Sequence, residues 1–238
     1  MNQSDMRIKY LFGILMLFLL AEFFLSACCA DEKNNKIISE EINNALAKRL
    51  LHEVDSILKF DSAFWSQTFN SQGPHTASED LLILQKLDSA ILLMPNDKVP
   101  YIQKYKYLVA CRKPEEILVL LRQMDSQLDL IQGDFLCLKG VLEYHKGDSI
   151  NGEKSFQRAD KAYHMEIIKC SSTDSLRYAS LKLSKSLNLS LMKNDFSIFR
   201  NELNVFHKTF PQIGIGSMTS IQCITNREEY YHKLFTVK

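Results

Sequence analysis

Few residues in this 238-residue chain have the spacing that nucleotide binding requires. Residues 147–155, GDSINGEKS, approach the G-x-x-x-x-G-K-S pattern, whose glycines and lysine hold phosphate groups. Glu153 stands where the lysine should be, and its carboxylate would repel a phosphate. Residues 214–216, Gly-Ile-Gly, lack the third glycine of a dinucleotide-binding loop. We therefore expect no nucleotide cofactor.

The cysteines and histidines do not have the spacing of a metal site either. None of the six Cys forms a C-x-x-C pair, and the six His are scattered along the chain. No G-x-S-x-G serine motif occurs. We predict no metal, no cofactor and no enzymatic activity, although a hydrolase stays open if the fold gathers unrelated polar residues. We expect the other four cysteines to occupy buried core positions: Cys111, Cys137, Cys170 and Cys223. The alternative is that some pair of them forms an envelope disulfide.

Composition favours a helical globular domain. Lys and Arg total 29 against 28 Asp and Glu, so the net charge of +1 does not favour nucleic acid as a partner. With 46% hydrophobic and 24% charged residues, the chain can bury one core behind a targeting segment. Only eight Gly and five Pro occur, which suits helices joined by short turns.

The N-terminus has the pattern of a secretory signal. Arg7 and Lys9 precede an uncharged apolar run over residues 11–21. The next residues, Leu25-Ser26-Ala27-Cys28, resemble the lipobox of bacterial lipoproteins. That resemblance implies removal of residues 1–27 and attachment of a diacylglyceryl group to the Cys28 thiol.

An uncleaved transmembrane anchor is the alternative interpretation of the same segment. Glu22 opposes it, since an acidic residue within a membrane-spanning helix is costly. Residues 28–36 would form a lipidated polar tether, and acyl chains would hold the domain on its membrane. Asp31 and Glu32 resemble the export signals of surface lipoproteins in some Gram-negative bacteria, although a solvated linker has the same composition. We expect a lipid-anchored protein of the bacterial cell envelope, at the outer membrane.

The first part of the mature chain predicts two helices. Over residues 38–58 apolar residues recur every three or four positions, which predicts an amphipathic helix. Its predicted buried face consists of Ile42, Leu46, Leu50, Val54 and Ile57. The turn cluster at residues 70–74 should end it. Ser78 as an N-cap, or Thr76 with Glu79 as a capping box, begins a second helix that stops at Pro95.

A repeat follows. Residues 87–97 resemble the end of a tetratricopeptide repeat, a helical hairpin of about 34 residues. Counting from Pro95 places units at 98–131 and 133–166, with residues 113–116 as the inter-helix turn of the first. The second is the better copy, because it has small residues where two helices cross, a turn and aromatic packing residues at Gly140, Tyr144, Gly147, Gly152, Phe156 and Ala159.

The C-terminal part is a weaker copy. A looser unit begins near Ser180, has its turn at residues 194–196 and lacks most of the small residues. We expect Ser172 or Thr173 to cap its first helix, and a last helix around residues 227–235.

These features predict an all-α fold, an α-α superhelix of antiparallel helical hairpins over residues 37–238. The resemblance to tetratricopeptide repeats implies a groove lined by first helices that holds an extended peptide or a partner helix. We expect a membrane-anchored scaffold or adaptor that binds a protein or peptide partner; the alternative is an envelope lipoprotein that binds a small ligand or glycan. Candidate groove residues are Ile102, Lys106, Val109, Cys137, Val141, Tyr144 and Asn188.

Overall fold

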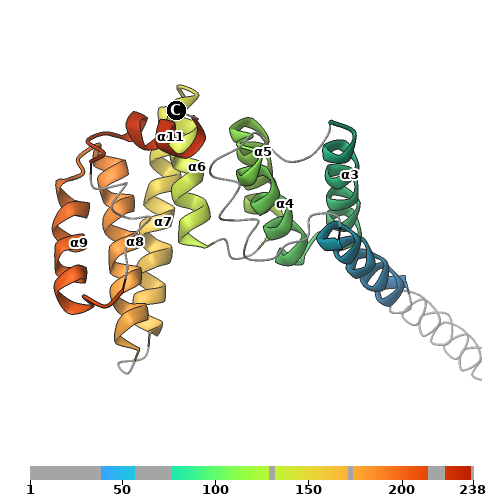
Figure 1. The fold of residues 1–238 in the computed structure, drawn as a ribbon, viewed down its shortest axis with the longest axis horizontal. Helices are drawn as coiled ribbons and strands as arrows, with labels where there is room; N and C mark the ends of the chain where they lie inside the picture. The colour runs from blue at the N-terminus through green and yellow to red at the C-terminus, as the bar shows by residue number, and fades with distance from the viewer. Residues whose placement is uncertain (1–38, 57–76, 129–131, 171–173, 214–222, 237–238) are drawn as a thin grey trace, which may run out of the picture.

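The computed structural model describes residues 39–56, 77–128, 132–170, 174–213 and 223–236, and every regular element in these ranges is a helix (Figure 1). The predicted all-α class is therefore confirmed for the described residues. The predicted signal, the lipidation site Cys28 and the tether lie outside them. Within the described ranges, none of the helices has both the length and the apolar character needed to cross a membrane. A helix over residues 39–56 is followed by α3 (Ala77–Leu93), α4 (Lys98–Ala110), α5 (Pro114–Gln127), α6 (Gly133–His145), α7 (Ser149–Lys169), α8 (Ser175–Lys193), α9 (Ser197–Thr209) and α11 (Arg227–Phe235).

Consecutive helices pack side by side, so that the chain forms a row of antiparallel hairpins (Figure 1). The hairpins α4/α5, α6/α7 and α8/α9 each turn within three residues. The last helix departs from chain order, because α11 packs on α6 rather than on α9 (Figure 1). The repeat boundaries predicted at Lys98 and Gly133 are both helix starts.

All three hairpins use the same kind of turn. One residue in each turn has a positive φ, which closes the helix end: Arg112 at 53°, Gly147 at 82° and Asn194 at 56°. In each, a backbone N–H donates to the carbonyl five residues earlier, at 3.0 Å for Lys113 to Leu108, 2.9 Å for Asp148 to Glu143 and 2.9 Å for Asp195 to Ser190. Glycine and asparagine adopt this conformation readily, whereas Arg112 does so at a steric cost.

Several predicted helix starts are wrong. The turn of the α4/α5 hairpin was predicted at residues 113–116, but it consists of residues 111–113. Pro114 begins α5, because its fixed φ suits a first helical position. The looser unit begins at Ser175 rather than near Ser180, and its cap is Asp174, whose side chain accepts from the Arg177 N–H at 3.0 Å. Ser78 lies inside α3, which begins at Ala77. Thr76, Ser172 and Thr173 lie outside the described residues.

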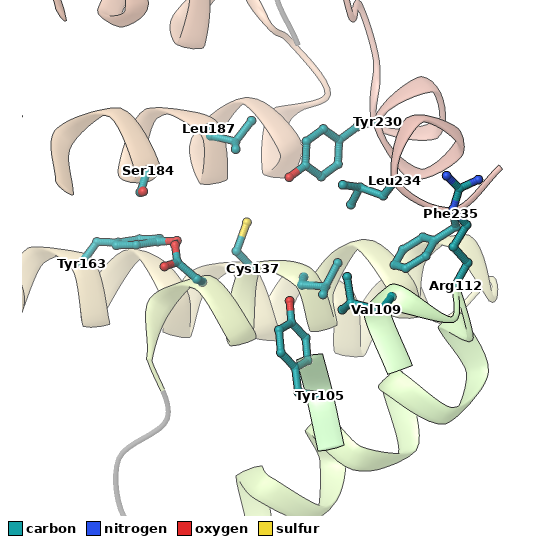
Figure 2. A pocket seen from close by; sticks show the side chains of 13 residues that line it. Tyr105, Val109, Arg112, Cys137, Tyr163, Ser184, Leu187, Tyr230, Leu234 and Phe235 are labelled. Atoms are coloured by element: carbon teal, nitrogen blue, oxygen red, sulfur yellow. The ribbon is translucent and has the colours of Figure 1, made fainter. Parts of the chain in front are cut away.

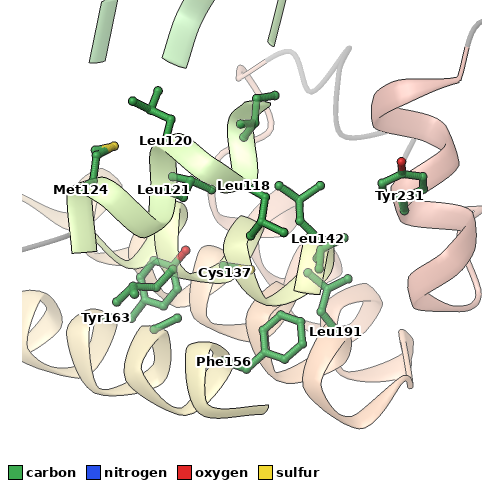
Figure 3. Close-up of a cluster of buried hydrophobic side chains, with 14 of the residues drawn as sticks. Leu118, Leu120, Leu121, Met124, Cys137, Leu142, Phe156, Tyr163, Leu191 and Tyr231 are labelled. Atoms are coloured by element: carbon green, nitrogen blue, oxygen red, sulfur yellow. The ribbon is translucent and has the colours of Figure 1, made fainter. Parts of the chain in front are cut away.

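The core has two parts. The smaller one joins the helix over residues 39–56 to α3 and to Tyr107 of α4, whose hydroxyl donates to Asp80 Oδ1 at 2.5 Å. The larger one runs from α3 to α11 and includes the side chains in Figure 3. The predicted buried face of the first helix is shifted by about one residue, since Ile42 and Leu46 are exposed while Ala47 and Leu51 are buried. Leu50 is half-buried, Val54 is buried as predicted, and Ile57 lies outside the described residues.

The α6/α7 hairpin packs as its small residues predict. A Cβ atom on Gly140 would lie 2.8 Å from Phe156 Cδ1, and one on Gly152 would lie 2.3 Å from Tyr144 Cδ2. Both distances are shorter than real side chains allow, so only glycine lets these aromatic rings lie against the opposing backbone. Phe156 and Ala159 are fully buried, in agreement with their predicted packing role.

Candidate binding site

A cavity of about 310 Å³ lies where the first helices of the three hairpins meet the C-terminal helix (Figure 2). This volume falls at the lower end of the range of small-molecule sites. Leu187 of α8 and Leu138 of α6 form part of the apolar wall, and Leu234 closes it from α11. The other lining residues are Tyr105, Val109, Ala110, Arg112, Asp134, Cys137, Tyr163, Ser184, Tyr230 and Phe235.

Three tyrosines contribute polar groups to the cavity. The Tyr163 hydroxyl donates to Asp134 Oδ1 at 2.5 Å, which fixes the carboxylate at one end of the cavity. The hydroxyls of Tyr105 and Tyr230 point into the space beside Cys137 from opposite sides (Figure 2). Among the described residues, neither of these two hydroxyls has a hydrogen-bond partner.

Burial keeps these groups protonated. Burial, with a smaller contribution from Asp134, raises the pKa of Tyr105 to about 12. Burial likewise raises the pKa values of Tyr163, Tyr230 and the Cys137 thiol above their ordinary values. A protonated thiol is a poor nucleophile, and a neutral phenol is a hydrogen-bond donor. The phenols of the cavity can therefore donate hydrogen bonds, and its thiol is a weak nucleophile.

Arg227 fastens the start of α11 to the array. Its side chain donates from Nε to the Leu191 carbonyl at 2.7 Å and from Nη2 to the Met192 carbonyl at 3.1 Å. These carbonyls belong to the last turn of α8, where helix carbonyls need partners. The guanidinium also lies 3.6 Å from the centre of the Tyr144 ring, a cation–π contact.

A second set of contacts holds α11 on α6. The rings of His145 and Tyr231 stack with centres 3.4 Å apart. His145 Nδ1 also lies 3.0 Å from a carboxylate oxygen of Glu228. Together with Arg227, these contacts place α11 over the C-terminal end of α6, where the chain covers its own first-helix face.

The predicted groove residues fall into separate groups. Val109 and Cys137 line the cavity. Val141 and Tyr144 lie beneath α11, in a smaller hollow that also contains Arg227. Half-buried Ile102 and exposed Lys106 lie on α4.

Asn188 has a different position from the others. It is fully buried, and its amide donates to the Phe156 carbonyl at 3.0 Å, so it joins α8 to α7. The position of Asn188 in the repeat pattern could not indicate this contact, because the pattern does not specify which neighbouring helix packs against the side chain. Tyr105, Tyr163 and Tyr230 were not predicted as site residues. They lie on α4, α7 and α11, and no local sequence signal brings these three helices together.

The expectation of buried cysteines is correct only in part. All four described cysteines are free thiols. Cys137 is buried, Cys111 and Cys170 are half-buried, and Cys223 is exposed. Among the described residues, no group of three or more acidic, histidine or cysteine side chains is placed to hold a metal ion.

A partly buried charge cluster joins α5 to the α6/α7 hairpin. Asp125 accepts from Arg158 at 2.6 Å through both carboxylate oxygens and from Lys139 Nζ at 2.5 Å. Burial alone raises the pKa of Asp125, but the hydrogen bonds from Arg158 and Lys139 lower it by more, so the pKa lies below its ordinary value. Nearby, buried Glu143 accepts from Ser155 Oγ at 2.7 Å. Because the charges are paired with one another, we assign this cluster a structural role.

No protein-family model, curated protein or solved structure matches the chain. Its function has to be inferred from its own residues and their geometry.

Proposed function

We propose that this protein is a lipid-anchored envelope lipoprotein that acts as a scaffold or adaptor, binding a protein partner on the face formed by α4, α6 and α8. We call this the first-helix face. The observation that carries the proposal is that α11, an amphipathic segment of the same chain, already packs on this face.

The contacts of α11 define what such a face can hold. On the side toward α6 and α8, α11 presents aromatic rings and the Arg227 guanidinium, and on the other side it is exposed. This is the helix-in-groove mode of recognition, in which a few anchoring side chains enter hollows between helices. A partner helix could use the same chemistry on the part of the face near Ile102 and Lys106, which lie on α4.

The membrane location rests on the lipobox resemblance at Cys28. Two or three acyl chains on one residue bind a bilayer far more firmly than a single chain does. Labelling with a clickable fatty acid should be lost in Cys28→Ala and kept in Cys29→Ala. Loss of label in Cys29→Ala alone would contradict the assignment and move the lipid to the next residue.

The partner-binding face can be tested by site-specific crosslinking in the native host. A photo-crosslinking amino acid at Lys106 should yield one discrete adduct, since this exposed side chain lies on a first helix. The matched control is the same group at Val119, an exposed residue of the second helix α5 that is 66% accessible. The expected result is an adduct from position 106 whose yield falls when excess protein without the photo-crosslinking group is added. Position 119 should give no adduct. Equal adducts from both positions, or none from either, would refute the proposal.

A further inference from the structure

The cavity between the first-helix face and α11 has features that a protein-binding scaffold does not need. It is lined mainly by apolar side chains, yet the hydroxyls of Tyr105 and Tyr230 point into it and have no partner among the described residues (Figure 2). Both residues are half-buried, so these hydroxyls are open to the space of the cavity and can donate to a ligand there. From this geometry we infer that the cavity is a binding site for a small, uncharged, largely apolar molecule with a carbonyl or ether oxygen. This goes beyond the proposed scaffold function and does not depend on it.

The size of the ligand follows from the volume. An apolar cavity of about 150 Å³ holds one benzene molecule. The cavity here has about 310 Å³, roughly twice that volume, which corresponds to a molecule of about twelve non-hydrogen atoms. The apolar wall of Val109, Leu138, Leu187 and Leu234 would contact its hydrocarbon part.

The polar groups specify an oxygen acceptor. The hydroxyls of Tyr105 and Tyr230 approach the same space beside Cys137 from α4 and α11, so one carbonyl oxygen with two lone pairs can accept from both. Their raised pKa values keep both phenols protonated and able to donate. An ammonium group could not accept these bonds. The lining holds one carboxylate, Asp134, and one guanidinium, Arg112, so these two charges balance and the cavity favours an uncharged acceptor.

The position of the cavity links ligand binding to α11. Tyr230, Leu234 and Phe235 come from α11, while the opposite wall comes from α4, α6 and α8. A ligand in the cavity would therefore contact both, and its binding should strengthen the packing of α11 on the first-helix face.

Two probes of similar shape test the inference on the full-length protein in lipid nanodiscs. They are 4-phenyl-2-butanone, which has a carbonyl oxygen, and butylbenzene, which has none. Affinity would be measured by NMR titration of the methyl groups of Val109, Leu187 and Leu234. Partitioning of a probe into the lipid is the same for every variant, so the ratio between variants reports on the cavity.

The matched variants remove one hydroxyl each. Tyr105→Phe and Tyr230→Phe should each weaken binding of the ketone by about two- to tenfold, the value of one hydrogen bond. Neither should weaken binding of butylbenzene. Tyr178→Phe, an exposed residue of α8, is the control and should change neither affinity. Circular dichroism of each variant would confirm that the helices are retained.

Three results would overturn the inference. The first is an absence of shifts at the three methyl groups with either probe. The second is ketone binding that does not change in Tyr105→Phe and Tyr230→Phe, because the hydroxyls would then not recognise the oxygen. The third is tighter binding of 4-phenylbutanoate than of the ketone, because the cavity would then select an anion.

Discussion

The α6/α7 and α8/α9 hairpins solve the same packing problem with different residues. In α6/α7, Gly140 and Gly152 let aromatic rings lie directly on the opposing helix. In α8/α9 the small residues are Ser186 and Ser190, both buried. The hydroxyl of Ser190 accepts from the Phe199 N–H at 3.0 Å and so caps the start of α9 from the neighbouring helix. The α8/α9 hairpin does have small residues; they are serines that combine close packing with a hydrogen bond.

The largest expected effect comes from removing the ring that lies against Gly140. Phe156→Ala should lower the free energy of unfolding by about 3–5 kcal/mol, because the fully buried ring leaves a cavity that the helices cannot close. Urea unfolding followed by circular dichroism would measure it. Phe206→Ala in α9 should cost less, since this ring lies at the end of the row, where the chain can relax. Equal losses in the two variants would contradict the difference between the hairpins.

A smaller effect is expected from adding one methyl group to a glycine. Gly152→Ala should destabilise the protein by about 1–3 kcal/mol through overpacking, even though alanine favours helices by up to about 1 kcal/mol. The clash is with the Tyr144 ring, at 2.3 Å from the added Cβ. In a Tyr144→Ala background the same substitution should therefore cost much less, and thermal unfolding of the four proteins would give the coupling. Additive effects would show that the ring does not set the glycine requirement.

In the other hairpin the corresponding test removes a hydroxyl. Ser190→Ala should cost about 1 kcal/mol, because the Phe199 N–H loses its acceptor in a buried place. Ser186→Ala is the matched control: its hydroxyl donates to Leu183 of the same helix at 2.8 Å, and its loss should have almost no effect on unfolding in urea. If the two variants lost equal stability, serine would act here only through its size.

The smallest expected effect concerns pH and the attachment of α6/α7 to α5. The pKa of Asp125 is lower in the folded protein than its ordinary value, so its contribution to stability is present above about pH 4 and is lost as pH falls through the folded pKa. Measured between pH 5 and pH 2, the free energy of unfolding of the wild type should fall more steeply than that of Asp125→Asn. Lys185→Gln, which removes the more exposed pair with Asp160 between α7 and α8, is the comparison and should keep the wild-type slope. Parallel curves for the wild type and Asp125→Asn would refute the role of the cluster.

Local signals predicted most helix boundaries. The turn at Gly147, the stop at Pro95 and the helix over residues 227–235 all depend on residues adjacent in sequence. Asn226, for example, caps α11 by accepting from the Glu229 N–H at 2.9 Å. The missed starts at Pro114 and Ser175 have local signals too, a proline that suits a first helical position and an aspartate that caps.

The candidate site could be predicted only in part. Val109 and Cys137 were chosen as first-helix residues and do line the cavity. Tyr230 comes from a helix more than eighty residues after α6 along the chain, and no sequence pattern indicates that α11 returns to α6. Asn188 was also predicted to line the groove. It does lie on a first helix, but its side-chain amide donates to the Phe156 carbonyl inside the protein.

The sequence by itself determined that the described chain is helical, where most helices start and stop, and that α6 and α7 must approach closely. These properties follow from backbone preferences, caps and small residues, which act over a few positions or within one hairpin. Only the tertiary structure decided that α11 covers the first-helix face, that the charges on α5, α6 and α7 pair, and that three tyrosines meet around one cavity. Such contacts join residues far apart in the chain, and they depend on side-chain shape and on which faces are left to bury.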